Sequence, residues 1–170
     1  ALLSAGGVID LIDDIASGKC RNGIANLRPP GHHAESEEMM GFCFFNNVAI
    51  AAKVAQAKHP DTIKRILILD WDVHHGNATE NQFIDDDSVL YISLHRHGGG
   101  FYPGSGAHSI VGTGQGTGFN VNIPWPTGDM GDADYLLAFH HRLMLLCSQQ
   151  AVSSISLMTL PPASVAMVLP

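Results

Sequence analysis

The residues with the clearest chemical potential lie between Leu69 and Asn77, in the run Leu-Asp-Trp-Asp-Val-His-His-Gly-Asn. Side chains at every second position of an extended chain share one face, so Asp70, Asp72 and His74 are predicted to project together. Two carboxylates and an imidazole held this close need a cation to neutralise them. Mixed oxygen and nitrogen donors suit catalytic zinc, which keeps one position open for water or substrate. A solvated polar strand end is the weaker interpretation, because the acidic residues follow a buried run.

The tandem pair His32-His33 is the second candidate. It follows two prolines and a glycine in the run Arg-Pro-Pro-Gly-His-His-Ala-Glu, which ends at Glu35. The prolines fix the approach of the chain and the glycine permits a tight backbone, so the pair is expected in a constrained loop. A metal-water hydrolase needs a base for the water proton and an acid for the leaving amine, and two imidazoles with different partners can divide these roles. Taken alone, the pair is better explained by structural hydrogen bonds in a turn.

The elements that must position these residues follow from the hydrophobic pattern. Strands are predicted at residues 23–27, 66–69, 89–94 and 119–123; the second is a continuous apolar run, as in a strand covered on both faces. Three helices are predicted. The first ends at Gly18, the second begins at Asn46 or Asn47 and stops before Pro60, and the third begins at Asp132. The apolar stripes of the first and third helices are Ile9, Leu11, Ile12 and Ile15, and Tyr135, Leu136, Phe139 and Leu143.

Strands that alternate with helices predict an α/β fold with a mainly parallel sheet. In such a sheet the site gathers at the carboxyl ends of the strands, and both histidine-bearing loops follow a predicted strand. The Gly-rich run at residues 112–118 is not a phosphate loop, because a strand rather than a helix follows it. His140-His141 is predicted to be a partly exposed pair on a helix.

Composition excludes several other classes of protein. The 170 residues are 45% hydrophobic and 15% charged, as in one soluble globular domain. The net charge of −7 offers no basic stripe for nucleic acid, and every apolar run is too short to cross a membrane. Cys20, Cys43 and Cys147 form no Cys-x-x-Cys pair, which argues for a reducing compartment rather than a disulfide framework.

Four motifs in one order resemble the histone deacetylase family, and together they span roughly residues 24–139. They are Arg-Pro-Pro-Gly-His-His-Ala-Glu, Gly-Phe-Cys-Phe-Phe-Asn-Asn, Asp-Trp-Asp-Val-His-His-Gly-Asn and Ser-Leu-His-Arg. Trp71, Asn77 and the run from Met130 to Tyr135 are similar to the class II branch in particular.

This resemblance implies a three-layer arginase-like α/β fold, incomplete at both ends in this chain. It implies hydrolysis of N6-acetyl-lysine to lysine and acetate in peptides or proteins, histones among them. It also implies Zn²⁺ and a structural K⁺ as cofactors, and a place in the nucleus, the cytoplasm or both. Corepressor partners cannot be read from the residues.

The resemblance implies a role for four catalytic residues. His32 and His33 match the tandem pair beside a zinc-bound water, with His33 as the general base. Asp70 matches the carboxylate that orients His32. Asn77 stands at the partner position of His33, which agrees with the general need for support behind a catalytic side chain.

The resemblance also implies metal and substrate sites. Asp72 and His74 match two of three zinc ligands. A structural potassium site is matched by Asp70, Asp72, His74, Ser93 and Leu94. Gly41, Phe42 and Tyr102 match a narrow tunnel for the acyl-lysine stem, and a methylene chain with a neutral amide end suits an apolar slot.

The sequence departs from the family at its C-terminal end. The third zinc ligand is expected as the Asp of a later Gly-x-Asp element, yet no Asp or Glu follows Asp134. Residues 1–146 are therefore predicted to be a partial catalytic domain and residues 147–170 a divergent tail. We expect a truncated chain with weak or no activity. Two alternatives stay open: a non-catalytic binding or scaffold protein with the deacetylase fold, and a related acetylpolyamine amidohydrolase.

Overall fold

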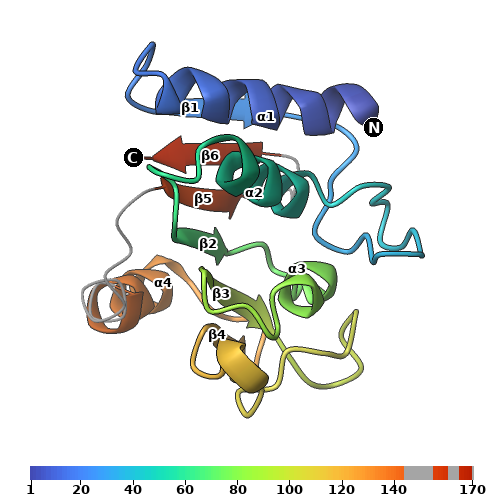
Figure 1. Cartoon of the computed structure of the whole chain (residues 1–170). Helices are drawn as coiled ribbons and strands as arrows, with labels where there is room; N and C mark the ends of the chain where they lie inside the picture. Colours follow the sequence, from blue (N-terminus) through green and yellow to red (C-terminus); the bar gives the residue numbers. More distant parts are fainter. Residues whose placement is uncertain (144–154, 161–164, 170) are drawn as a thin grey trace.

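Among the residues that the structure describes, six strands form one mixed sheet with helices on both of its faces (Figure 1). This computed structural model describes residues 1–143, 155–160 and 165–169. The strand order across the sheet is β1-β6-β5-β2-β3-β4. The elements are α1 (Leu2–Ala16), β1 (Gly23–Asn26), α2 (Asn47–Lys58), β2 (Ile66–Asp70), α3 (Asn77–Gln82), β3 (Val89–Arg96), η1 (Gly114–Gly116), β4 (Asn120–Trp125), α4 (Asp132–Ala138), η2 (Phe139–Leu143), β5 (Ile155–Leu160) and β6 (Val165–Leu169).

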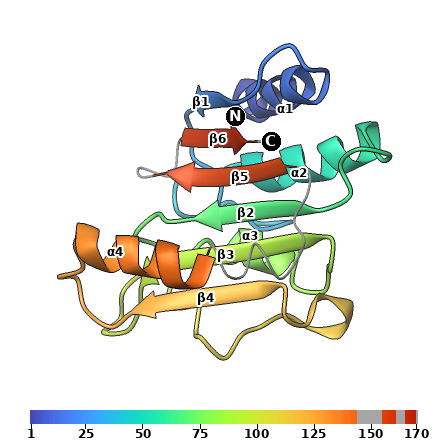
Figure 2. The same ribbon diagram turned by 90° about the vertical axis from the view of Figure 1, so that its left-hand side faces the viewer.

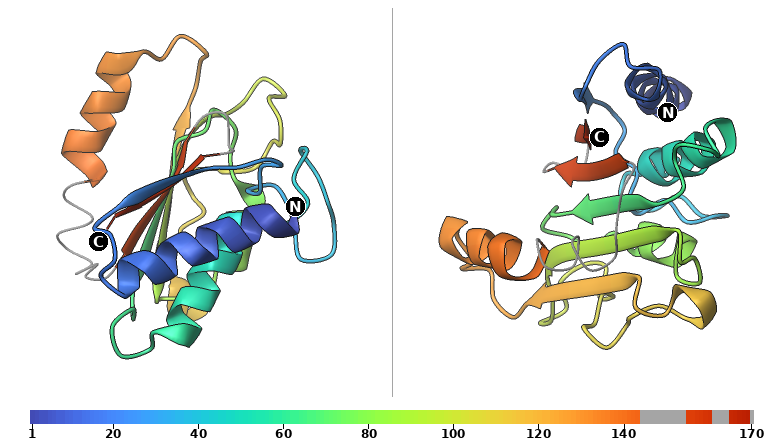
Figure 3. Two further views of the ribbon diagram at one scale, coloured as in Figure 1. Left: turned by 90° about the horizontal axis from the view of Figure 1, so that it is seen from above. Right: turned by 60° about the vertical axis from the view of Figure 1, so that its left-hand side comes forward.

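The molecule has three layers. Helices α1, α2 and α3 lie on one face of the sheet and α4 lies on the other (Figures 2 and 3). Alternate residues of β2 are divided between two hydrophobic clusters, because successive side chains of a strand point to opposite faces. Ile66 and Ile68 pack in the cluster with α1 and α2, whereas Leu67 and Leu69 pack in the cluster with α4. The predicted three-layer α/β arrangement is confirmed.

The centre of the sheet is parallel. β2 pairs in parallel with β3 on one side and with β5 on the other, and β3 pairs in parallel with β4. Pairs β1–β6 and β5–β6 are antiparallel. Asp70 at the end of β2 is in register with Ser93 of β3 and with Thr159 of β5. The carboxyl ends of these strands therefore meet at one edge, as the sequence predicts.

The C-terminal strands contain no residue that could serve as the third zinc ligand expected from the resemblance. β5 and β6 lie in the segment predicted to be a divergent tail, and β5 occupies the position next to β2. Its sequence, Ile-Ser-Leu-Met-Thr-Leu, contains no carboxylate. The predicted boundary at residues 146–147 and Cys147 lie outside the described residues.

Most predicted elements appear with small changes at their ends. The side-chain oxygen of Asn46 accepts a hydrogen bond from the backbone N–H of Ala49 at 3.1 Å, so this residue caps α2 as predicted. Helix α3 was not predicted, because six residues are too short to show a helical period. None of the helices that the structure describes is long and apolar enough to cross a membrane.

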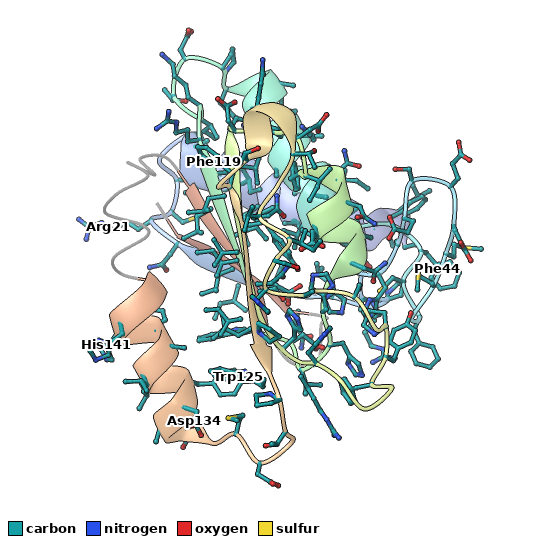
Figure 4. The ribbon with its side chains drawn as sticks, turned by 90° about the horizontal axis from the view of Figure 1, so that it is seen from below. Arg21, Phe44, Phe119, Trp125, Asp134 and His141 are labelled. Carbon is teal, nitrogen blue, oxygen red and sulfur yellow. The ribbon has the colours of Figure 1, made fainter. Side chains whose placement is uncertain are left out.

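Helix α4 packs with a narrower face than its sequence predicts. Tyr135 and Phe139 pack against the second cluster, and the ring of Tyr135 lies 5.5 Å from that of Trp125. Leu136 is 57% exposed, so its predicted burial is wrong: the helix presents only a thin stripe to the sheet. The side chain of Leu143 lies outside the described part. His140 and His141 are exposed, as predicted, and His141 points away from the sheet while Trp125 lies toward α4 (Figure 4).

Candidate catalytic and metal-binding site

The turn after β2 brings two potential metal donors together. The backbone N–H of Asp72 donates to Oδ1 of Asp70 at 3.2 Å, and the N–H of His74 donates to Oδ1 of Asp72 at 2.8 Å. Each carboxylate thus holds the backbone two residues further on, in the manner of an Asx turn. As a result, Nδ1 of His74 lies 3.2 Å from Oδ1 of Asp72.

These two donors fit two positions of a zinc shell. Asp72 is buried and the His74 side chain is 38% exposed, so the pair opens toward solvent on one side. A catalytic zinc site takes three protein ligands. Within residues 1–143 and the two C-terminal strands, no group of three His, Cys, Asp or Glu side chains has the geometry to hold a metal ion. The described residues therefore do not complete a zinc site by themselves.

His32 is held by the carboxylate of Asp70. Its Nδ1 lies 2.8 Å from Oδ2 of Asp70, and its Nε2 lies 4.0 Å from Oδ1 of Asp72. Burial by itself lowers the pKa of His32, but the carboxylates of Asp70 and then Asp72 outweigh it and raise this pKa above the ordinary value. His32 is therefore the imidazole of the pair that holds a proton more readily.

His33 has a different hydrogen-bond partner, and its pKa is shifted in the opposite direction from that of His32. Its Nδ1 lies 2.7 Å from Oδ1 of Asn77, while Nδ2 of Asn77 donates to Oε1 of Glu35 at 2.5 Å. Since the amide N–H group is used by Glu35, the amide oxygen faces His33, so Nδ1 of His33 must donate and its Nε2 carries the lone pair. Burial, and then the adjacent His32, lower the pKa of His33 to about 4. His33 is neutral near pH 7.

The loop that carries the pair is fixed by close backbone contacts. The backbone carbonyl of His32 accepts a hydrogen bond from the N–H of Ala78 at 3.2 Å, which ties the loop to α3. A Cβ at Gly31 would lie 2.6 Å from the backbone nitrogen of Asn47, so only glycine fits between the loop and α2. Gly41 has φ +56° and a Cβ there would lie 2.7 Å from Cγ of His33. Both glycines are therefore needed to place the imidazoles.

The predicted tunnel residues take unequal positions. Tyr102 is 42% exposed, and its ring centroid lies 5.0 Å from that of His33 and 6.0 Å from that of His74, edge-on in both cases. Phe42 follows Gly41 with φ 64° and is 90% exposed. Tyr102 thus lies against the site, and the pairing of Phe42 with Tyr102 across a tunnel stays a prediction.

The predicted potassium ligands lie on neighbouring strands. Asp70 and Ser93 are buried and in register on β2 and β3. The hydroxyl of Ser93 hydrogen-bonds Nδ1 of His95 at 2.8 Å. The side chain of Leu94 packs in the second hydrophobic cluster, so only its carbonyl is available to a cation. Potassium binding here stays a prediction.

The structure adds three residues that sequence reasoning left without a role. Glu35 supports Asn77, and also accepts a hydrogen bond from Asn81 at 2.9 Å. The ring of Phe101 stacks on that of His74, with centroids 4.9 Å apart and an interplanar angle of 8°. Cζ of Arg96 lies 4.6 Å from the centroid of the Phe101 ring. Glu35 is the last residue of the tandem-histidine motif and Arg96 is the last residue of the Ser-Leu-His-Arg motif, so their place in these motifs could have indicated a role. Phe101 belongs to neither motif, and nothing in the sequence indicated its contact with His74.

Comparison with known proteins identifies the family. The histone deacetylase domain family matches residues 1–151. The chain is 56% identical over 140 residues to histone deacetylase 4 of Caenorhabditis briggsae, covering 82% of this chain and 16% of that protein. It is 54% identical over 149 residues to histone deacetylase 15 of Arabidopsis thaliana, covering 87% of this chain and 26% of that protein.

A solved structure agrees with the sequence comparisons. The crystal structure of the HDA15 HD domain matches with a TM-score of 0.87 and 50% identity, over 93% of this chain and 44% of that one. The arginase-like arrangement predicted from the motifs is therefore shown by the fold as well as by the residues. The chain covers less than half of each of these proteins, and the family match extends over residues 1–151 of its own length. It belongs to the histone deacetylase family.

Proposed function

We propose that the protein to which this segment belongs is a zinc-dependent lysine deacetylase that acts on acetylated peptides or proteins, histones among them. The observation that carries the proposal is that the tandem histidines have different partners, Asp70 for His32 and Asn77 for His33, beside two metal donors. The ring centroid of His33 lies 6.0 Å from that of His74. General base, general acid and metal donors thus share one small region at the sheet edge.

The chain's own residues perform the proton transfers in this proposal. His33 accepts the proton of the attacking water at Nε2, because Asn77 holds its Nδ1–H. His32 donates to the leaving lysine amine, because Asp70 favours its protonated form. Asp72 and His74 would hold zinc together with a third ligand, and zinc would supply a Lewis acid there. Tyr102 lines the approach of the acyl-lysine stem.

The third zinc ligand decides how active this chain is. Asp72 and His74 are two of the three expected ligands, and the described residues supply no third. We therefore expect the 170-residue chain to turn over acetyl-lysine weakly or not at all. The same observation favours a second candidate for the chain by itself, a non-catalytic binding module that retains the deacetylase fold.

The test is turnover of an acetyl-lysine peptide by the folded chain with added zinc, beside an Asp72→Ala variant and a matched Asp61→Ala control at an exposed residue outside the site. Zinc-dependent turnover that is lost only with Asp72→Ala supports the deacetylase. A folded chain that binds zinc without turnover supports the binding module. A folded chain whose zinc affinity is unchanged by Asp72→Ala would contradict the proposed metal site.

We extend the proposal to the structural cation and to location in the cell. A potassium ion held by Asp70, Ser93 and the carbonyl of Leu94 binds the folded chain only, so it raises the melting temperature when sodium is exchanged for potassium. An equal melting temperature in the two salts would argue against it. The proposed location is the nucleus, the cytoplasm or both, and a fluorescent fusion observed in cells tests it.

A further inference from the structure

Three histidines outside the proposed chemistry converge on one short piece of loop. Nδ1 of His75 lies 2.8 Å from the hydroxyl of Ser105. Nδ1 of His97 lies 3.1 Å from the carbonyl oxygen of the same residue, and Nε2 of His95 lies 3.0 Å from the carbonyl oxygen of Gly106. The histidines come from the turn after β2 and from the end of β3, so they join two strand ends to the loop that follows.

The direction of the hydrogen bond between His95 and Gly106 follows from the partner atoms. His95 is fully buried, and both of its ring nitrogens have hydrogen-bond partners. A carbonyl oxygen can only accept, so Nε2 of His95 carries a proton and donates it to Gly106, while Nδ1 meets the hydroxyl of Ser93. The His95 ring packs 4.6 Å from that of His75. The buried imidazole therefore holds the backbone of Gly106 from below.

The loop is shaped to receive these rings. Gly106 has φ +86°, and a Cβ there would lie 2.6 Å from Cγ of His75 and closer still to Nε2 of His95. Ser105 is partly exposed and Gly106 is buried, so this piece of loop rests on the rings below it. Any side chain at position 106 would lift the loop from the histidines.

The other end of the same loop touches the candidate site. Phe101 stacks on the ring of His74 at 4.9 Å, and Tyr102 lies edge-on to the ring of His33 at 5.0 Å. The guanidinium of Arg96 lies over Phe101. Only Pro103 and Gly104 separate these aromatic residues from Ser105, so the hold on Ser105 and Gly106 also limits where the two aromatic rings can lie.

We propose that His75, His95 and His97 are positioning residues, which fasten Ser105 and Gly106 so that the Phe101–Tyr102 pair stays against the metal donor and the general base. The inference rests on the proposed function for the importance of those two contacts. The geometry that it asserts can be measured without metal or substrate. It gives a role to three of the histidines that the catalytic scheme leaves unused.

The first test compares Ser105→Ala with Ser105→Thr in the metal-free 170-residue chain. The alanine removes the hydroxyl that meets His75, and the threonine retains it. We expect amide hydrogen exchange over residues 98–106 to accelerate roughly five- to tenfold in the alanine variant, as for the loss of one hydrogen bond, and to stay at the wild-type rate in the threonine variant. The NMR signals of the His33 and His74 rings should move in the alanine variant, because Phe101 and Tyr102 leave them.

The second test replaces one of the three positioning histidines, His97. His97→Asn keeps an N–H donor near the position of Nδ1 and His97→Leu removes it, and His97 is only partly buried, so both variants are expected to fold. Amide hydrogen exchange over residues 98–106 should accelerate in the leucine variant and stay at the wild-type rate in the asparagine variant. Methyl signals of the buried core serve as the control for general unfolding.

Wild-type exchange rates and ring signals in folded Ser105→Ala and His97→Leu would overturn the inference. These readouts need no turnover, so a failure of the proposed deacetylase activity leaves them unaffected. Where turnover is measurable, Ser105→Ala should raise KM for the acetyl-lysine peptide more than it lowers kcat, because the loop positions the substrate approach rather than the proton transfers.

Discussion

Replacement of Asn77 by aspartate should convert His33 from a weakly basic imidazole to one that titrates near neutral pH. In the wild-type chain an uncharged amide oxygen faces Nδ1 of His33 at 2.7 Å, and burial holds the pKa at about 4. Asn77→Asp puts a negative charge at the same distance. A neighbouring opposite charge typically raises such a pKa by one to three, so the His33 pKa should rise to between about 5 and 7.

Glu35 determines where in that range the value falls. Its Oε1 lies 2.5 Å from Nδ2 of Asn77, so the introduced carboxylate would face a second carboxylate and lose its donor. Two carboxylates at this distance share a proton, which reduces the charge that His33 senses. The double change Asn77→Asp with Glu35→Gln restores a donor at position 35. The double variant should therefore reach the upper part of the range and the single variant the lower part.

The assay is a titration of the His33 ring signals by NMR in the metal-free chain. The order of midpoints expected is wild type, then Asn77→Asp, then the double variant. A His33 midpoint that stays near 4 in the double variant would refute the reasoning, because it would mean that Asn77 does not face Nδ1 of His33.

Three further predictions concern the same site. Gly41→Ala should lower the free energy of unfolding by about 1–3 kcal/mol in thermal denaturation, since φ +56° is strained for alanine and its Cβ would meet the His33 ring; an unchanged melting temperature would contradict this. Asp70→Asn should drop the pKa of His32 below its ordinary value in an NMR titration, because burial then acts with less opposition; a pKa that stays raised would show that Asp70 is not the cause. Acidification from pH 6.5 toward 4 should destabilise the chain, because His33 and His95, each with a folded pKa of about 4, bind protons first in the unfolded state. This loss of unfolding free energy reaches up to about 1.4 kcal/mol per pH unit for each of the two histidines. His32 behaves differently: its folded pKa is raised, so its contribution to stability is complete below pH 6.5 and is lost only as the pH rises through the folded pKa. Melting temperatures that do not fall between pH 6.5 and 4 would contradict the prediction.

The sequence predicts the centre of the fold and the clustering of the site for physical reasons that act locally. A continuous apolar run has few alternatives to a buried strand, so β2 and the position of Asp70 at its end follow from the residues alone. Asn46 predicts the start of α2 because a cap acts on the next turn only. The shared edge of Asp72 and the tandem histidines follows from the parallel order of the strands.

Features that depend on contacts between distant segments were not predictable. Leu136 fits the helical period, but the period cannot say how wide a face the sheet will cover. Phe101 is an ordinary aromatic residue in a glycine-rich stretch until the fold places it on His74. The segment predicted to be a divergent tail supplies β5, which pairs in parallel with β2, because an exposed strand edge accepts backbone hydrogen bonds from any extended segment.

The single carboxylate of Asp70 has consequences for how this family can diverge. It meets Nδ1 of His32 and the backbone N–H of Asp72, and the hydroxyl of Tyr91 lies 3.4 Å from Oδ2. The hydroxyl of Tyr91 also donates to the carbonyl of Gly76 at 3.2 Å, where a Cβ would crowd both side chains. Substitutions among these residues cannot be additive, because each changes the surroundings of the same two oxygen atoms. We therefore expect the residues around the Asp70 carboxylate to change together in evolution. Once a lineage has replaced one of them, the remaining ones no longer meet the same partner and can be replaced as well.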